Sequence, residues 1–356
     1  MQRVENNTDP TISNRKLASL QRVDDVIKHP NADALEIATV LGWQIVTRVN
    51  EVKKGEMVVY CEIDSKLPGD AEWLPDAVKK RVGEQKDKSF FRVKTIKIRG
   101  ELSQGLIIPC NGLPALEREF DVGTNVTEQL GITKYEVESI PDSSNSPNKF
   151  PVHVLDKTEE TRVQSNPGVL RVLEGKPYVI TVKHDGTSAT YLIDPDTQQF
   201  LVCSRNQIRT APSGSELERE RCVYWEMAQK YDIESFLREY PNIAIQGEIC
   251  GPGIQKNLLG LKETEFHVFT IVDISKRVRL SYSLTSLFCE MAGLKMVTLL
   301  EKGESFNYLD IKSLLQKAEG KYENTSNERE GIVVRSQDST VSFKVISNKY
   351  LLKNDL

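Results

Sequence analysis

The chain has 356 residues, of which 39% are hydrophobic and 28% are charged, and its net charge is −4 at pH 7. These values describe a soluble globular protein with full cores, long enough for two domains. The absence of any run of about 18 apolar residues excludes a helical membrane span. The small net charge neither indicates nor excludes nucleic-acid binding.

Six cysteines lie scattered at positions 61, 110, 203, 222, 250 and 289, without a Cys-x-x-Cys pair. This spacing argues against a zinc site and favours a reducing compartment. The start, Met1–Asn7, lacks the apolar core of a secretory signal. We therefore expect an intracellular protein, cytoplasmic or nuclear, that does not bind membranes.

The first 135 residues predict short strands separated by turns. Ile37–Val40 and Gln44–Thr47 flank Leu41–Trp43 and predict a hairpin. His29 precedes the turn-forming residues Asn31–Asp33 and is expected to serve that turn rather than to bind a ligand. Short strands at regular spacing indicate a small β-barrel. Its further strands are expected at Met57–Tyr60, Phe91–Arg99 and Gly105–Pro109.

The strand predicted at Phe91–Arg99 is the candidate RNA-binding element. Its side-chain alternation changes phase between Thr95 and Ile96, which predicts a β-bulge that bends the strand. A curved basic strand suits contact with a phosphate backbone without base readout. A solvated charged face is the alternative. The basic residues are Arg92, Lys94, Lys97 and Arg99.

A linker is predicted between two domains. Ile140–Asn148 is rich in Pro, Ser, Asn and Asp and has no periodicity. We place the first domain at residues 1–135, the linker at 136–150 and the second domain at 151–356. The second domain mixes strands with helices, so the fold class is α+β. Its helices are predicted at Glu216–Tyr240, Leu287–Met296 and Ile311–Ala318.

The segment Lys183–Ser188 follows the strand-like run Tyr178–Val182 and places a lysine, an acid, a glycine and two hydroxyls in one turn. A strand that delivers a lysine into such a turn suits an amine that attacks a phosphate. The attack requires a pKa lowered by burial or by neighbouring positive charge. Taken alone, the motif also fits a solvated turn lysine, so the downstream segments decide.

Phosphoryl chemistry on a lysine needs carboxylates for a hydrated divalent cation, basic groups for the phosphates and an aromatic platform for a purine. A cation would also favour the neutral amine of Lys183 by charge repulsion, and Gly186 would let the backbone approach the nucleotide. Each candidate alone could be an ordinary turn, bulge or core residue, but the ordered set is far less probable by chance. The candidates are Asp185, Glu248 and Glu330 for Mg²⁺ or Mn²⁺, Arg205 and Lys344 for phosphates, and Phe269 for the purine.

This set resembles the motifs of the covalent nucleotidyltransferase superfamily, which comprises polynucleotide ligases and mRNA capping enzymes. The resemblance covers residues 150 to 350 and is highly specific. It implies that Lys183 is the motif I nucleophile and that the later motifs follow in order. These are Arg205 in motif Ia, Glu248 in motif III, Phe269 in motif IIIa, Glu330 in motif IV and Lys344 in motif V.

Within the superfamily, the RNA ligase branch is favoured. The chain ends at Leu356, which leaves no room for the C-terminal OB domain that DNA ligases and capping enzymes usually carry. Ser342–Lys353 is similar to one ATP-dependent RNA ligase family whose members place an OB-type domain in front, and Ile27–Ala38 resembles the opening of OB-type RNA-binding domains. The resemblance implies an N-terminal OB-type β-barrel and a C-terminal nucleotidyltransferase domain of antiparallel sheets flanked by helices.

The implied activity is the joining of RNA 3′-hydroxyl and 5′-phosphate ends by a monomer, through lysyl-AMP, with ATP and Mg²⁺ or Mn²⁺, for RNA repair or nick sealing. Lys157–Gln164 resembles the family's approach to the adenosine pocket, which implies a role there for Gln164. Motif V departs from the pattern because Ile346 replaces the second lysine of many RNA ligases; Lys349 and Lys353 are candidate substitutes. The alternatives are a DNA ligase or GTP-using capping enzyme, and a non-catalytic OB-type RNA-binding protein.

Overall fold

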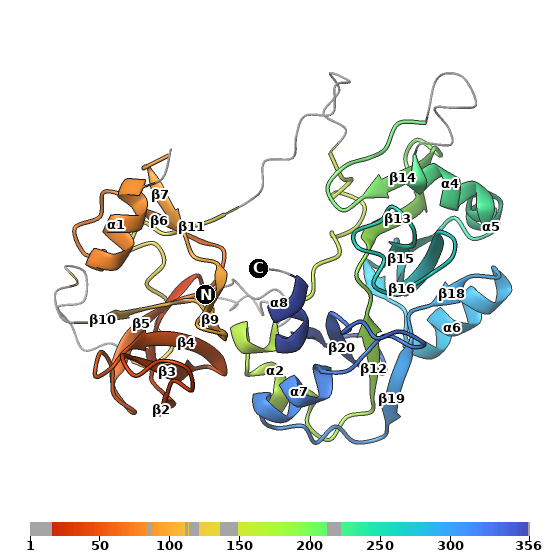
Figure 1. Cartoon of the computed structure of the whole chain (residues 1–356). Helices are drawn as coiled ribbons and strands as arrows, with labels where there is room; N and C mark the ends of the chain where they lie inside the picture. Colours follow the sequence, from red (N-terminus) through yellow and green to blue (C-terminus); the bar gives the residue numbers. More distant parts are fainter. Residues whose placement is uncertain are drawn as a thin grey trace, which may run out of the picture. The chain divides into compact units, whose positions relative to one another are not determined.

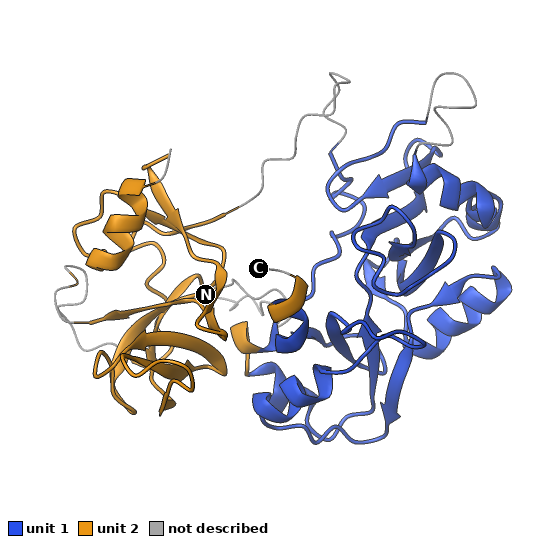
Figure 2. Ribbon diagram, in the orientation of Figure 1, with its two compact units in different colours: residues 1–11, 141–163, 168–351 blue, residues 12–140, 164–167, 352–356 orange. Residues whose placement is uncertain are grey.

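The computed structural model describes residues 16–84, 87–110, 113, 121–135, 149–211 and 222–354. The chain divides into two compact units, one of residues 1–11, 141–163 and 168–351 and one of residues 12–140, 164–167 and 352–356 (Figure 2). Met1–Asn7, residues 216–221 and the predicted linker up to residue 148 lie outside the described residues. The last two linker residues belong to the larger unit. There the backbone of Lys149 forms an isolated β-bridge with that of Gln207, and Phe150 is buried.

The smaller unit is built of short antiparallel strands (Figure 1). Its cores gather around large buried side chains such as Trp43, Tyr60 and Leu67. The first sheet holds β1 (Ala18–Arg22), β5 (Met57–Cys61) and β10 (Leu106–Pro109), and the second holds β2 (Asp25–Lys28), β3 (Leu35–Val40) and β4 (Trp43–Arg48). The third holds β11 (Thr133–Lys134), β6 (Ser65–Pro68) and β7 (Phe90–Arg92), while β8 (Thr95–Ile98) pairs with β9 (Glu101–Gln104) and α1 spans Asp76–Glu84.

The predicted hairpin and turn of this unit are confirmed. β3 and β4 pair up to Val40 and Trp43. The turn residues Leu41 and Gly42 both have positive φ, as a type I′ turn requires. His29 serves its turn, because its Nδ1 accepts the Asn31 N–H at 3.0 Å. The strands predicted at Met57–Tyr60 and Gly105–Pro109 are β5 and β10.

The single strand predicted over Phe91–Arg99 is wrong. β7 pairs with β6, whereas β8 pairs with β9, so the chain changes sheets between Arg92 and Thr95. Val93 marks the change: its N–H donates to the Ser65 carbonyl, and its own carbonyl accepts the Asp64 N–H. The bend therefore comes two residues before the predicted bulge, and its cause is a change of partner strand.

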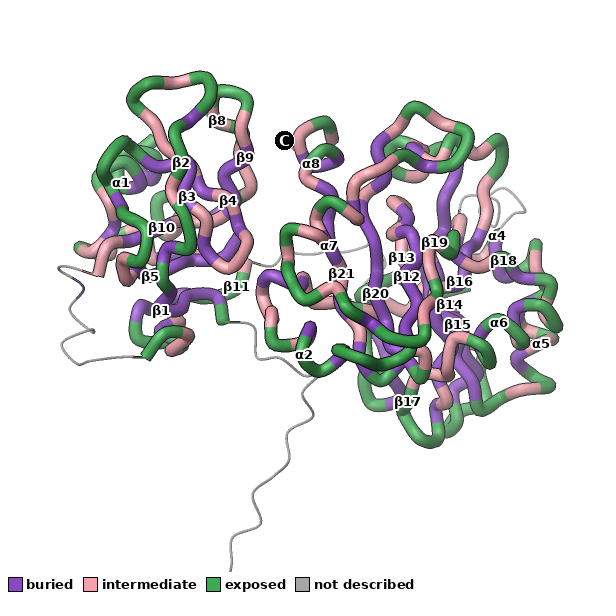
Figure 3. The backbone as a smooth tube through the Cα atoms, turned by 90° about the horizontal axis from the view of Figure 1, so that it is seen from below, coloured by how far each residue is buried: buried purple, intermediate pink, exposed green. Residues whose placement is uncertain are grey.

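The larger unit contains two sheets whose central strands are buried along most of their length (Figure 3). The described strands of these two sheets pair antiparallel except β16 with β18. The four-stranded sheet holds β19 (Leu299–Gly303), β12 (Tyr178–Lys183), β20 (Gly331–Ser336) and β21 (Ser342–Ile346) in this order. The six-stranded sheet holds β14 (Phe200–Ser204), β13 (Thr187–Ile193), β15 (Ile243–Cys250), β16 (Glu265–Asp273) and β17 (Val278–Arg279), with β18 (Lys295–Met296) beside β16.

The helices of this unit differ from prediction where the backbone turns left-handed. The helix predicted over Glu216–Tyr240 is broken at Asp232, which has a φ of 47°. The helix predicted to end at Met296 ends before Gly293, whose φ is 63°. The observed helices are α2 (Val169–Leu173), α4 (Val223–Lys230), α5 (Ile233–Glu239), α6 (Tyr282–Met291), α7 (Ile311–Ala318, as predicted) and α8 (Asn348–Asn354), with a 3₁₀ turn at Val163–Ser165.

None of the helices in the described ranges has the length and apolar character needed to span a membrane.

Candidate active site

The predicted nucleophile stands at the end of a strand ladder. Lys183 is the last residue of β12, and its partner across the ladder is Gly331, the first residue of β20. Glu330 directly precedes that partner, so the lysine and the carboxylate meet at the same end of the sheet. The Lys183 Nζ lies 2.7 Å from the Glu330 Oε2, and the two side chains are 27% and 17% exposed.

The chain then crosses to the other sheet through Asp185 and Gly186. A Cβ on Gly186 would lie 2.3 Å from the Ile249 carbonyl oxygen and 2.9 Å from the Glu248 Cγ. Glycine is therefore required for the close approach of this turn to β15, which brings Asp185 and Glu248 together. The sequence had suggested that Gly186 makes room for a nucleotide; the structure adds this packing reason.

The carboxylates set the charge state of the lysine. Burial lowers the pKa of Lys183, but Glu330, Glu248 and Asp185 outweigh that effect, so this pKa lies above its ordinary value. Burial and the charges of Glu330 and Asp185 raise the pKa of Glu248 to about 7, although Lys183 opposes the shift. The protein's own groups thus hold the pKa of Lys183 above its ordinary value, and a cation among these carboxylates would lower it.

The carboxylates fit a hydrated cation. Among the described residues, no group of three or more His, Cys, Asp or Glu side chains could hold a metal ion directly. Mg²⁺ usually keeps several of its waters and binds proteins through few carboxylates, and Mn²⁺ shares its preference for oxygen ligands. Asp185, Glu248 and Glu330 therefore suit an ion held through its water shell.

A group of positive charges lies on the β21 side of Lys183. The backbone N–H of Lys344 donates to the Thr161 carbonyl at 2.9 Å, which holds the chain at Thr161 beside β21. Burial, followed by the positive charges of Lys183 and Arg162, lowers the pKa of Lys344 to about 8, and Arg205 adds to the effect. Lys183, Arg162 and Arg205 are thus within electrostatic reach of Lys344, and such a group of cations suits a bound phosphate chain.

Arg205 is half-exposed and lies 3.6 Å from the Glu159 carboxylate. Of the predicted charged groups, Asp185, Glu248 and Glu330 act on Lys183, whereas Arg205 acts on Lys344. Arg162 was missed in the sequence, although it belongs to the segment Lys157–Gln164 that carries the resemblance.

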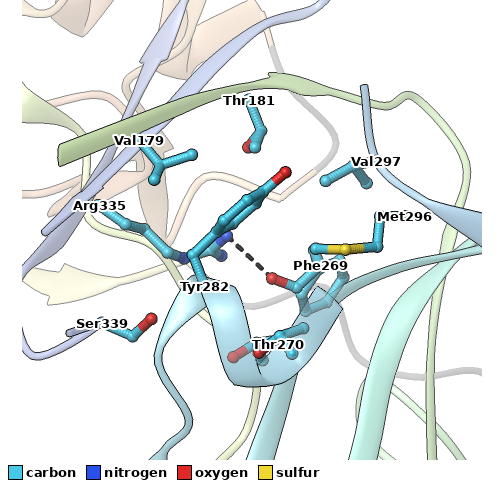
Figure 4. Close-up of a pocket in the computed structure, with 10 residues that line it drawn as sticks. Val179, Thr181, Phe269, Thr270, Tyr282, Met296, Val297, Arg335 and Ser339 are labelled. Carbon is cyan, nitrogen blue, oxygen red and sulfur yellow. Dashed lines mark hydrogen bonds between the residues drawn. The ribbon is translucent and has the colours of Figure 1, made fainter. Parts of the chain in front are cut away.

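Phe269 lines a pocket between the two sheets (Figure 4). It is the extra residue of a β-bulge, because Gln246 pairs with Thr270 and Gly247 pairs with Val268. The pocket is also lined by Val179 and Thr181, which alternate along β12 onto the same face as Lys183. A flat ring against Phe269 would therefore lie on the side of the sheet that carries the lysine.

A buried ion-pair network supports this pocket. The Arg335 guanidinium donates to the Phe269 carbonyl at 3.0 Å and to the Glu160 carboxylate at 2.8 Å. Arg279 donates to the same carboxylate at 3.2 Å, and Ser342 donates to it at 2.5 Å. After the cost of burial, the two arginines lower the pKa of Glu160 to about 2. This network was not predicted from the sequence. The one local feature that pointed to a buried ion pair was a charged residue, Arg335, in an otherwise apolar strand.

Gln164 is buried, and its Oε1 has no hydrogen-bond partner within the described residues. It falls in the short segment 164–167 that groups with the smaller unit. Of the candidate substitutes in motif V, Lys349 is paired with Glu319 at 2.7 Å, and Lys353 lies in the last turn of α8. Ile346 is buried.

The predicted RNA-binding residues differ among themselves. Lys94, Lys97 and Arg99 are exposed. Arg92 instead lies 2.7 Å from the Asp64 carboxylate and 3.9 Å from the centre of the Tyr135 ring. Three of the four are therefore open to solvent, whereas Arg92 is engaged within its own unit.

Known proteins resemble the whole chain. An OB-fold domain model matches residues 17–110, and an RNA ligase model matches residues 176–351. Together with the sheets described above, these matches confirm the predicted fold. No curated protein sequence matches significantly.

Solved structures of the Naegleria gruberi RNA ligase are similar over nearly the full length. A lysine-to-methionine mutant with AMP and Mn shares 32% identity, covers 96% of this chain and 99% of its own, and has a TM-score of 0.80. The complex with pyrophosphate has the same identity and coverage and a TM-score of 0.79. A lysine-to-alanine mutant with ATP and Mn shares 30% identity over 96% and 99% of the two chains, with a TM-score of 0.78.

Proposed function

Because the chain belongs to the RNA ligase family, we propose that it seals RNA 3′-hydroxyl and 5′-phosphate ends through a covalent AMP on Lys183. It is an ATP-dependent RNA ligase that uses Mg²⁺ or Mn²⁺. The observation that carries the assignment to Lys183 is its position, which is close to the carboxylates and within electrostatic reach of the half-buried Lys344.

In the first step, the neutral Lys183 Nζ attacks the α-phosphorus of ATP. The ammonium group first releases one proton to solvent. A phosphorus–nitrogen bond then forms, the bond to pyrophosphate breaks, and the nitrogen releases a second proton to solvent. Asp185, Glu248 and Glu330 would hold a divalent cation, which would supply positive charge that lowers the lysine pKa and offsets the phosphate charge. Lys344 and Arg205 would neutralise the phosphate chain.

In the second step, an oxygen of the RNA 5′-phosphate attacks the α-phosphorus, and the bond to Lys183 breaks. The lysine returns to its amine form, and the RNA carries AMP on its 5′ end. In the third step, the RNA 3′-hydroxyl attacks the 5′-phosphate phosphorus and releases its proton to solvent, AMP leaves, and the strand is joined. Positioning and charge neutralisation carry all three displacements, as expected for phosphoryl transfer.

The nucleotide base is proposed to bind against Phe269, whose pocket shares a sheet face with Lys183. Gly186 would lie under the nucleotide, and Gln164 would contact the adenosine. The OB-fold domain is proposed to hold RNA through Lys94, Lys97 and Arg99. We propose that the enzyme acts as a monomer. An intracellular location, cytoplasmic or nuclear, is supported by six free cysteine thiols.

The test is covalent labelling with ATP that carries a radioactive α-phosphate. Wild-type protein with Mg²⁺ or Mn²⁺ should retain the label after denaturation, and Lys183→Met should not. Equal labelling of the mutant would exclude Lys183 as the nucleophile, and an unlabelled wild type would leave only a non-catalytic RNA-binding role. Labelling by GTP in preference to ATP would indicate capping chemistry, and sealing of DNA but not RNA nicks would indicate a DNA ligase.

A further inference from the structure

One buried hydroxyl connects the backbones of two catalytic segments. The Tyr322 hydroxyl donates to the Lys183 carbonyl at 3.0 Å. It accepts the N–H of Asp185 at 3.1 Å and the N–H of Glu330 at 3.1 Å. A phenol has one proton to donate and two lone pairs to accept with, so this hydroxyl uses its full capacity on these backbone groups.

The position of this hydroxyl follows from the end of the β12–β20 ladder. Lys183 and Gly331 form the last pair. Beyond this pair the two strands diverge and their ladder of hydrogen bonds ends. Buried backbone groups there need other hydrogen-bond partners. Tyr322 supplies these partners and holds together the two segments that carry the lysine and the carboxylate. Its burial raises its pKa, so the hydroxyl stays protonated and keeps its donor role.

The loop that carries Tyr322 is itself held in place. The backbones of Lys321 and Glu328 form an isolated antiparallel β-bridge across the loop. The next residue, Arg329, binds the carbonyls of Ala318, Lys317 and Glu319, and so caps the end of α7. The tyrosine side chain is 5% exposed, and its ring meets the buried His184 ring edge-on at 6.3 Å.

We propose that Tyr322 is a positioning residue for ligation, which sets the placement of Lys183 relative to Glu330 and Asp185. It touches no reacting atom and acts through the backbone of residues that do. The proposal rests on the function proposed above, because it assigns to Tyr322 the alignment of the nucleophile with the carboxylates.

The test is single-turnover formation of lysyl-AMP by Tyr322→Phe, which removes only the hydroxyl. We expect the rate constant to fall about 10- to 100-fold, the size of effect that a displacement of about 1 Å produces. The ATP concentration at half-maximal rate should stay within about twofold of the wild-type value, because the pocket at Phe269 is untouched. Circular dichroism at the assay temperature checks that the variant is folded.

The matched control is Tyr191→Phe. Tyr191 is fully buried in the same unit, and its hydroxyl donates to the Tyr224 carbonyl at 2.9 Å, away from the motif backbones. It should form lysyl-AMP within about twofold of the wild-type rate. An unlabelled wild type would refute the proposed function itself. With an active wild type, three results would overturn the role of Tyr322: an unchanged rate in Tyr322→Phe, an equal loss in the control, or unfolding of Tyr322→Phe.

Discussion

Lys183 and Lys344 are close enough for their charges to interact, yet their pKa values shift in opposite directions. Lys183 has a carboxylate at 2.7 Å and is surrounded by acids. Lys344 is half-buried, and its strongest charged neighbours are Lys183 and Arg162. The site therefore binds a proton more tightly on Lys183, the proposed nucleophile, than on Lys344. A cation among the carboxylates would then control when Lys183 becomes reactive.

Glu330→Gln should lower the pKa of Lys183, because the nearest negative charge is lost. We expect the pH midpoint for chemical acetylation of Lys183, followed by mass spectrometry, to fall relative to the wild type. Lysyl-AMP formation should fall at the same time, because a cation ligand is lost. Glu319→Gln is the control, since Glu319 pairs with the exposed Lys349. An unchanged midpoint would show that Glu330 does not hold the proton.

Lys344→Met should abolish adenylylation and stabilise the fold at pH 7. The Lys344 pKa is about 8 instead of 10.5. The unfolded state therefore binds more protons between these values, so burial of Lys344 costs stability below pH 8 and the cost disappears as pH rises to 10.5. The gain at pH 7 should be on the order of 3 kcal/mol. Urea unfolding at pH 7 and near pH 10 measures it, with the exposed Lys312→Met as the control.

For Glu248→Gln, the gain in unfolding free energy should grow with rising pH, the opposite of the pattern expected for Lys344→Met. The folded protein binds a proton on Glu248 up to about pH 7, whereas the ordinary value is 4.5. Stability is lost as pH rises through this window, because the carboxylate must ionise in a buried, acidic site. The variant should therefore exceed the wild type in unfolding free energy at pH 8 and match it at pH 4. A constant difference across this range would contradict the raised pKa.

The sequence predicted the parts of this site that follow local rules. Strand-forming runs that end in Lys183 or begin after Glu330 can be identified without a structure, and the order of the motifs supplies the chemistry. Tyr322 could not be found this way, because its three partners are brought to it by the ladder end and not by spacing. The error at Phe91–Arg99 has a similar origin, since the choice of partner strand decides where that strand breaks.

Substitutions of Glu160 and Arg335 should have strongly coupled effects on the free energy of unfolding. Arg335→Met alone leaves a buried carboxylate with fewer partners and should cost about 3–5 kcal/mol of unfolding free energy. The double variant with Glu160→Gln should recover part of this loss, because no unpaired charge remains. The half-exposed pair Glu234 and Arg238 is the control and should show a coupling of about 0.5 kcal/mol or less. Additive losses at Glu160 and Arg335 would refute the network.

The basic residues of the OB-fold domain should separate into RNA contacts and a structural contact. Replacing Lys94, Lys97 and Arg99 together by alanine should weaken RNA binding and reduce the slope of log affinity against log salt by about 2, because each phosphate contact on a single strand contributes about 0.7. Arg92→Ala should instead lower the melting temperature, because the Arg92 guanidinium bridges Asp64 and Tyr135. Binding titrations at several salt concentrations, with thermal unfolding of the same variants, measure both effects. An unchanged salt slope in the triple variant would place the RNA on another face of the domain.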